Sequence, residues 1–178
     1  MMEHGTEDMK KYWRFGAMIA TSMIVMFLLM YLHTYQWSHV RWSETRFFMT
    51  LIMGAGMTVI MLSFMLGMYK NPKLNMIIYA GSFVLFALAL WLVRSQTTIG
   101  DQAYMKAMIP HHSIAILTSE RADIEDLRVR ELADDIIKAQ RREIKEMEWL
   151  INDISENGKV TNESERIQRA IPEFEGNP

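Results

Sequence analysis

The 178-residue chain contains no cysteine, and this absence excludes several kinds of site. Without thiols there are no disulfide bonds, no thiolate metal ligands and no cysteine nucleophile. The net charge of −2 also lacks the basic excess that a nucleic-acid-binding surface requires, so no nucleic-acid partner is expected. Methionine, in contrast, is abundant at 17 residues, so the soft donor that this sequence does supply is thioether sulfur.

Patterns that carry catalytic chemistry are also missing. There is no phosphate-binding loop, no strained nucleophile turn and no pair of carboxylates on one helix face. A ferritin-type di-iron site needs E-x-x-H spacing, but Met108 and Ile109 stand three residues before His111 and His112. We therefore expect a protein that is not an enzyme.

Three apolar runs occupy the first half of the chain, over residues 13–32, 46–69 and 74–93. Each reaches the ~20 residues that a helix needs to cross a bilayer. Tyrosine and tryptophan gather near their ends, as in an aromatic belt at the two membrane surfaces. The first run lacks the small-residue cleavage site of a signal peptide. The sequence therefore predicts a terminal segment over 1–12 and a three-span membrane domain over 13–94.

Basic residues near the spans predict the orientation, because cytoplasmic loops carry more lysine and arginine. Three spans place the two ends of the chain on opposite sides of the membrane. The basic residues of one side are Lys10, Lys11, Arg14, Lys70 and Lys73, and those of the other are Arg41, Arg46 and Arg94. Five against three predicts a cytoplasmic N-terminal segment and an extracytoplasmic C-terminal part.

The C-terminal part reads as a helical hairpin over residues 99–154. Asp101 is expected to cap a first helix over 101–122, and the second helix is expected over 127–154. The polar tail over 155–178 is expected to be loosely ordered, with one helical turn near its middle.

The stretch YMKAMIPHHSIAIL, residues 104–117, places methionine and histidine on the first helix of this hairpin. Alternating steps of four and three residues from its start select one helix face. That face comprises Asp101, Met105, Met108, His112, Ala115, Ser119 and Ala122. An ordinary core seam would carry leucine or isoleucine at these places.

The second helix has a more ordinary seam with one polar member. Its residues are Val129, Leu132, Ile136, Gln140, Ile144, Met147, Ile151 and Ile154. Folding the chain near residue 124 brings Met105, Met108 and His112 opposite Met147, with Glu143 or Gln140 nearby. Thioether and neutral imidazole bring no charge, and they suit Cu(I) and, by extension, Ag(I).

Other interpretations of these residues stay open. Methionine commonly fills gaps in an apolar core, so a purely structural role competes with metal binding. His111 points about 100° away from His112, and is either a second ligand or a residue near the membrane surface or a partner chain. Pro110 cannot donate to the Lys106 carbonyl, which predicts a kink in the helix.

The pattern D-x-x-Y-M-x-x-M-I-P-H-H (101–112), followed by Q-x-x-E-I-x-x-M (140–147), resembles a bacterial family. It is catalogued as "domain of unknown function three-oh-five", a ferritin-like helical family, and the membrane half looks like a common subtype of it. The family's motif residues fall on Asp101, Met108, His111, His112, Gln140, Glu143 and Met147. Thr118 stands where many members have methionine.

The resemblance implies copper and silver handling outside the cytoplasm. It places the chain in a bacterial inner (cytoplasmic) membrane with a periplasmic or extracellular metal-binding domain, and implies copper-handling partner proteins. Asp101, Gln140 and Glu143 would then surround the ligands Met105, Met108, His111, His112 and Met147.

A two-helix hairpin cannot bury both faces of each helix, so a second copy is expected to complete a ferritin-like four-helix bundle. The side chains expected to stay partly exposed without that copy are Ile114, Ile116, Leu117, Ile137 and Trp149. The sequence thus predicts a homodimer or a higher homo-oligomer.

The second span carries a row of methionines with an alternative function. The row comprises Met49, Met53, Met57, Met61, Met65 and Met68. Lipid contact and helix packing explain such a row simply, and Gly54 and Gly56 would permit close helix approach. The alternative is a thioether conduit for Cu(I), resembling eukaryotic high-affinity copper transporters, although the G-x-x-x-G motif of their third span is missing here.

These patterns together predict an all-α fold of three transmembrane helices followed by an extracytoplasmic hairpin. The predicted function is a lipid-embedded copper-binding protein for metal capture, tolerance or handover. A transmembrane copper conduit and a structural oligomerisation module are the alternatives.

Overall fold

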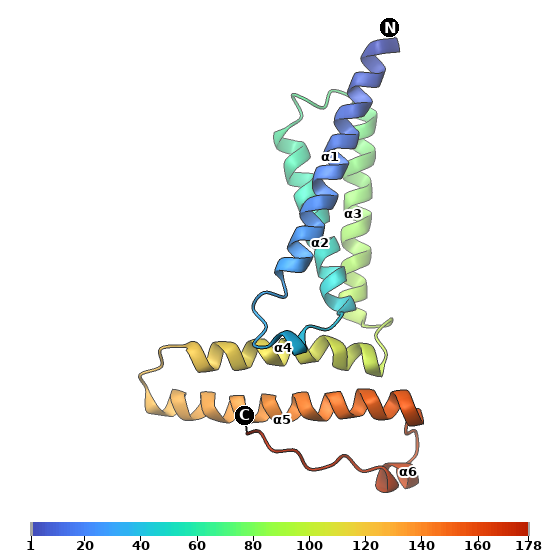
Figure 1. Cartoon of the computed structure of the whole chain (residues 1–178). Helices are drawn as coiled ribbons and strands as arrows, with labels where there is room; N and C mark the ends of the chain where they lie inside the picture. Colours follow the sequence, from blue (N-terminus) through green and yellow to red (C-terminus); the bar gives the residue numbers. More distant parts are fainter. Residues whose placement is uncertain (1, 178) are drawn as a thin grey trace. The chain divides into compact units, whose positions relative to one another are not determined.

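The computed structural model describes residues 2–177, with side chains from Glu7 onward, and its regular structure there is entirely helical (Figure 1). The elements are α1 (Met2–Leu29), the short 3-10 helix η1 (Trp37–His39), α2 (Glu44–Phe64), α3 (Pro72–Ser95), α4 (Asp101–Arg121), α5 (Leu127–Asn157) and α6 (Glu163–Gln168). Three of these helices, α1 to α3, are long and apolar enough to cross a membrane. The prediction of an all-α fold with three such helices is confirmed.

The chain forms two compact units. The first, the helical bundle, contains the chain up to Met30 together with Glu44–Thr98. The second, the hairpin unit, contains Tyr31–Ser43 and the chain from Ile99 onward. The connecting segment between α1 and α2 therefore belongs with the hairpin, which the sequence did not indicate.

Local signals explain where several helices begin and end. The Asn71 side chain accepts from the backbone N–H groups of Lys73 (3.1 Å) and Leu74 (3.2 Å), which starts α3. The Asp126 carboxylate accepts from the Arg128 N–H at 2.9 Å and starts α5. Gly158 follows the end of α5 with φ 79°, a left-handed value that favours glycine.

Two predicted boundaries are wrong. Gly100 rather than Asp101 is the N-cap of α4, and Asp101 is the first helical residue. The second membrane helix ends at Phe64, five residues before the predicted end, and Met65 and Met68 lie in the turns that follow. The methionine row therefore does not continue along one helix.

The core of the bundle joins α1 to the region around the end of α2. Phe15, Ile19, Leu62 and Tyr69 are buried together. Methionines 23, 57, 61 and 65 pack against this cluster, whereas Met49, Met53 and Met68 are exposed. The predicted row is thus divided between core packing and the outer surface of the bundle.

Close packing of α1 on α2 depends on one glycine. A Cβ atom built on Gly54 would overlap the Met23 side chain, while one built on Gly56 would meet nothing within 4 Å. The expectation of close helix approach is confirmed for Gly54 and wrong for Gly56.

In the hairpin unit, α4 and α5 run antiparallel and side by side (Figure 1). Their shared core consists of Met105, Ile109, Ile116, Ile137, Ile144 and Met147, with Met108 packed against it. Ile116 and Ile137 were expected to stay partly exposed, and this is wrong because both face the partner helix. Ile114, Leu117 and Trp149 are half-buried, as expected for residues beside the core.

The C-terminal tail is more closely tied to the hairpin than predicted. Arg169 pairs with Asp153 and also donates to the Gly158 carbonyl at 3.0 Å. The Lys145 ammonium donates to two tail carbonyls, those of Glu175 (3.0 Å) and Asn177 (3.1 Å). The tail holds a short helix, α6, and then runs along α5.

Candidate functional site

The predicted thioether donors gather inside the hairpin. Met105 comes from the first turns of α4 and Met147 from α5, and both belong to the buried cluster, with exposed fractions of 6% and 9%. Met108, one turn after Met105, packs against the same cluster and is half-buried. The register expected from the sequence therefore brings these three sulfur-bearing side chains into one region.

His112 lies across the hairpin from Glu143, and its side chain is 13% exposed. The His112 Nδ1 atom is 3.1 Å from the Glu143 Oε2 atom, close enough for an ion pair but not aligned as a hydrogen bond. Burial lowers the pKa of His112 below its ordinary 6.5, against the opposing effect of Glu143, and the neighbouring His111 lowers it further. At neutral pH the imidazole is therefore uncharged and able to bind a metal.

The other predicted residues are less closely involved. His111 is exposed, and its ring centroid is 6.1 Å from that of His112 with the planes tilted by 60°. Gln140 is half-buried on α5. Asp101 forms an ion pair with Lys159 at 2.6 Å, so it ties the tail to the start of α4. Thr118 is exposed and donates to the Ile114 carbonyl at 3.1 Å.

The predicted face of α4 is rotated relative to the observed buried face. The buried residues are Met105, Ile109, Pro110, Ser113 and Ile116 rather than the Ala115 and Ser119 side of the helix. The helix continues through Pro110 without a new start. Two surfaces cover α4, because α5 packs on one side and residues 31–43 contact it on another.

Sequence reasoning missed the polar cluster under residues 31–43. The fully buried Ser113 Oγ accepts a hydrogen bond from the Tyr35 N–H at 2.7 Å and lies 2.9 Å from the His39 Nδ1. Burial lowers the pKa of His39, Arg41 lowers it further and Glu148 opposes both. Ser113 is buried and therefore inaccessible to a substrate. Its contacts with Tyr35 and His39 instead hold the connecting segment against α4. The sequence offered one signal, a histidine between two apolar runs.

A cavity of about 340 Å³ lies beside this cluster. Two of its charged lining residues form ion pairs, Arg141 with Glu120 and Glu148 with Arg41 at 3.3 Å, and a third, Lys145, donates to the tail carbonyls of Glu175 and Asn177. Arg141 also lies over the Tyr35 ring, 6.0 Å from its centroid. The cavity therefore lies between the connecting segment and α5, and its lining mixes paired charged groups with apolar side chains such as Ile116 and Ile144.

Within the described part of the chain, no three histidine, aspartate or glutamate side chains converge to hold a metal ion. That donor set leaves out thioether sulfur, which the methionines of the hairpin core carry. Fold and site together describe a helical protein with three helices able to span a membrane and a hairpin whose core contains Met105 and Met147, with Met108 packed against it.

Comparisons with known proteins place the hairpin unit in a family. Residues 101–174 match the family described as "Domain of unknown function (DUF305)". The chain is 31% identical to the "Uncharacterized protein L153" of Acanthamoeba polyphaga mimivirus over 152 residues, which cover 82% of this chain and 98% of the relative. No solved structure matches the chain. The chain belongs to the DUF305 family.

The match to the viral relative is longer than the family region. Since it covers 82% of this chain, it must extend well into the part before residue 101, where the three apolar helices lie. The similarity thus includes both units of the chain.

Proposed function

We propose that this protein is a membrane-anchored copper-binding protein that holds Cu(I), or Ag(I), in the core of its hairpin. The ligands are Met105, Met108, His112 and Met147, and His111 assists from the exposed side. The observation that supports this most is the gathering of three thioether side chains from two facing helices in one cluster. Thioether and imidazole donors select soft, low-charge ions.

The surroundings of His112 fit a metal ligand. Metal-binding histidines commonly turn their second ring nitrogen toward a carboxylate, which fixes the ring and its tautomer. The Glu143 carboxylate lies 3.1 Å from Nδ1, although the pair is not aligned as a hydrogen bond, and Nε2 is the nitrogen proposed to bind the metal. The lowered pKa of His112 keeps the imidazole neutral, so protons compete less with the metal.

The location and biological role follow from charge and family resemblance. Five basic residues against three favour a cytoplasmic N-terminal segment, with the hairpin on the periplasmic or extracellular side of a bacterial inner membrane. There the protein would capture copper, contribute to metal tolerance or hand the ion to copper-handling proteins. A conduit along the second membrane helix has less support, because its methionines are divided between core and surface.

A second copy of the chain is the expected partner of the hairpin. Leu127, Val129 and Leu132 on α5 remain exposed, with Val129 at 49% and Leu132 at 59%. The sequence had placed Val129 and Leu132 in the hairpin's own seam, and this is wrong, since Ala133 and Ile137 are buried there instead. Pairing of these exposed side chains between two copies would complete a four-helix arrangement.

A Cu(I) titration of the full chain in detergent, against a competing chelator, tests the metal site. One saturable site is expected, and the double variant Met108→Leu/His112→Ala should weaken it by more than the roughly 10–100-fold loss caused by removing an outer partner of a ligand. The matched control is Met76→Leu, which removes an exposed methionine of α3. Circular dichroism establishes that each variant keeps its helices.

Two results would refute the metal site. One is the absence of saturable binding by the unaltered chain. The other is unchanged affinity in the double variant with its helices intact. Either result would leave the buried methionines as packing residues of a structural module.

A further inference from the structure

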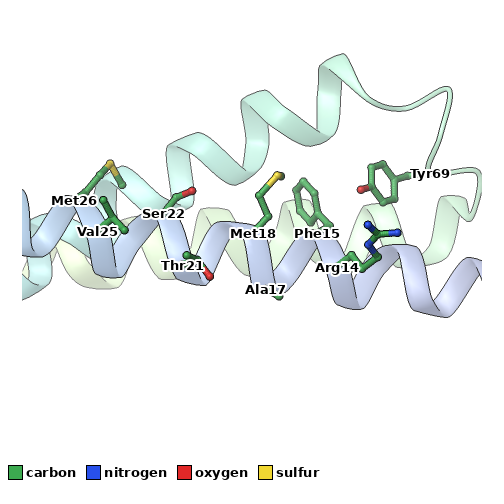
Figure 2. A pocket seen from close by; sticks show the side chains of 9 residues that line it. All are labelled: Arg14, Phe15, Ala17, Met18, Thr21, Ser22, Val25, Met26 and Tyr69. Carbon is green, nitrogen blue, oxygen red and sulfur yellow. The ribbon is translucent and has the colours of Figure 1, made fainter.

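A groove of about 820 Å³ runs along one side of α1 within the helical bundle (Figure 2). Residues three and four apart along the helix line it, so one helix face forms most of its wall. The lining residues are Arg14, Phe15, Ala17, Met18, Thr21, Ser22, Val25, Met26 and Tyr69. From Arg14 to Met26 the helix rises about 18 Å, at ~1.5 Å per residue.

The two ends of the groove differ in chemistry. Arg14 stands at one end beside Tyr69, which packs on Phe15 with ring centroids 5.3 Å apart. The Arg14 guanidinium is exposed and has no hydrogen bond or ion pair to any described residue. Toward the other end the wall is formed by Val25 and Met26, which carry no charge. The groove is therefore amphipathic along its length.

A polar network marks the level of Arg14 as the polar edge of the bundle. Tyr12, half a turn away, donates to the Asn75 Oδ1 at 2.7 Å, and the Asn75 amide donates to the Tyr69 carbonyl at 2.7 Å. Tyrosine and such polar side chains are typical of the membrane–water interface. Arg14 is thus placed at headgroup level, and Met26 lies about three turns deeper in the hydrocarbon region.

We propose that this groove binds one phospholipid with an anionic headgroup, an activity separate from the metal site. The Arg14 guanidinium would bind the phosphate, because its planar donors match phosphate oxygens. One acyl chain would lie along α1 from Phe15 to Met26, an uncharged and mostly apolar wall that is interrupted by the hydroxyls of Thr21 and Ser22 and is comparable in length to a lipid tail. A second copy of the chain fits less well, since parallel packing of the same two faces would bring two Arg14 charges together.

Native mass spectrometry of the full chain, released from detergent with phosphatidylglycerol or with phosphatidylcholine of the same acyl chains, tests the proposal. One retained phosphatidylglycerol is expected. Arg14→Gln should weaken its binding about fivefold, the contribution of one basic residue near an anionic surface. Lys73→Gln, which removes an exposed charge from the start of α3 and outside the groove, should leave the binding unchanged.

A second pair of variants tests the groove itself. Ala17→Trp adds bulk inside the groove and should abolish retention of both lipids, while Ala80→Trp adds the same bulk on the exposed side of α3 and should not. Equal losses in Arg14→Gln and Lys73→Gln, or no retained lipid, would overturn the proposal. So would a dimer, free of lipid, that Ala17→Trp alone dissociates.

Discussion

The buried hydroxyl of Ser113 fixes the position of the connecting segment on α4. Its oxygen lies between the Tyr35 N–H and the His39 ring, at 2.7 and 2.9 Å, and no part of the side chain is exposed. These contacts satisfy a polar group that would otherwise be costly to bury. They also fix the segment that carries Tyr35 and His39 against α4, on the residue next to His112. His112, the histidine of the proposed metal site, is therefore held on a supported stretch of helix.

His39 should make the stability of the protein dependent on pH. Its folded-state pKa is lowered below 6.5, mainly by burial, so the unfolded chain binds this proton more readily. The stability that it contributes is fully present above about 6.5 and is lost as the pH falls through the lowered pKa. One such group changes the unfolding free energy by at most about 1.4 kcal/mol per pH unit.

Thermal unfolding followed by circular dichroism between pH 7.5 and 5.0 measures this effect. His39→Gln should flatten the loss of stability on acidification, because one of the two described histidines with a lowered pKa is gone and only His112 remains. His33→Gln, an exposed histidine of the same connecting segment, should behave like the unaltered protein. If His39→Gln loses stability as steeply as the unaltered chain, His39 does not titrate as described.

Among the elements, α1 and α2 depend on a single point of close approach. Gly54 leaves no room for a Cβ atom beside the Met23 thioether, whereas Gly56 faces open space. Small residues of this kind let membrane helices approach each other, because packing rather than hydrophobic burial holds them together in lipid. Of the two nearby glycines, only Gly54 makes the tight contact with Met23 of α1.

The matched variants Gly54→Val and Gly56→Val should separate the two glycines. Valine at 54 must displace Met23 and should destabilise the bundle by about 1–3 kcal/mol, as overpacking usually does. Valine at 56 meets no neighbouring atom and should have little effect. The measurement is the midpoint of thermal unfolding in detergent. Equal midpoints for both variants would show that the α1–α2 contact does not need the glycine.

At the scale of the whole molecule, the hairpin unit leaves apolar side chains without a partner in one chain. The exposed Leu127, Val129 and Leu132 lie near the start of α5, beside the turn of the hairpin. Val129 and Leu132 lie on the same side of α5, about 60° apart around the helix, and exposed apolar surface of this kind commonly marks an interaction site. The proposed copper site lies within one hairpin, so a second copy would add stability without supplying a ligand.

Light scattering of the detergent-solubilised chain, corrected for bound detergent, should give the mass of a dimer or larger assembly. Leu132→Ser should shift the chain toward the monomer. Ile167→Ser, an equally apolar and exposed position on α6, should not change the mass. An unaltered chain that is monomeric at all concentrations would contradict the predicted homo-oligomer.

The sequence by itself determined the elements of this protein. Long runs without charge predict the three membrane-length helices, and the change to charged, helix-forming sequence after residue 100 predicts the hairpin and its turn. Helical spacing also predicted that Met105, Met108 and Met147 share one apolar cluster, because a short turn leaves little freedom in how two helices align. Each of these features depends on the periodicity of one helix or on a short connection between two neighbouring helices, and both can be read from the sequence.

Only the tertiary structure decided which face of α4 is buried and what covers it. The covering segment, residues 31–43, is distant in sequence and irregular, so no periodic pattern marks its contact with Ser113. It covers Ser113 on α4, and burial in this contact lowers the pKa of His39. Whether a side chain is buried depends on every element that packs around it. Helical spacing describes only the helix to which the side chain belongs.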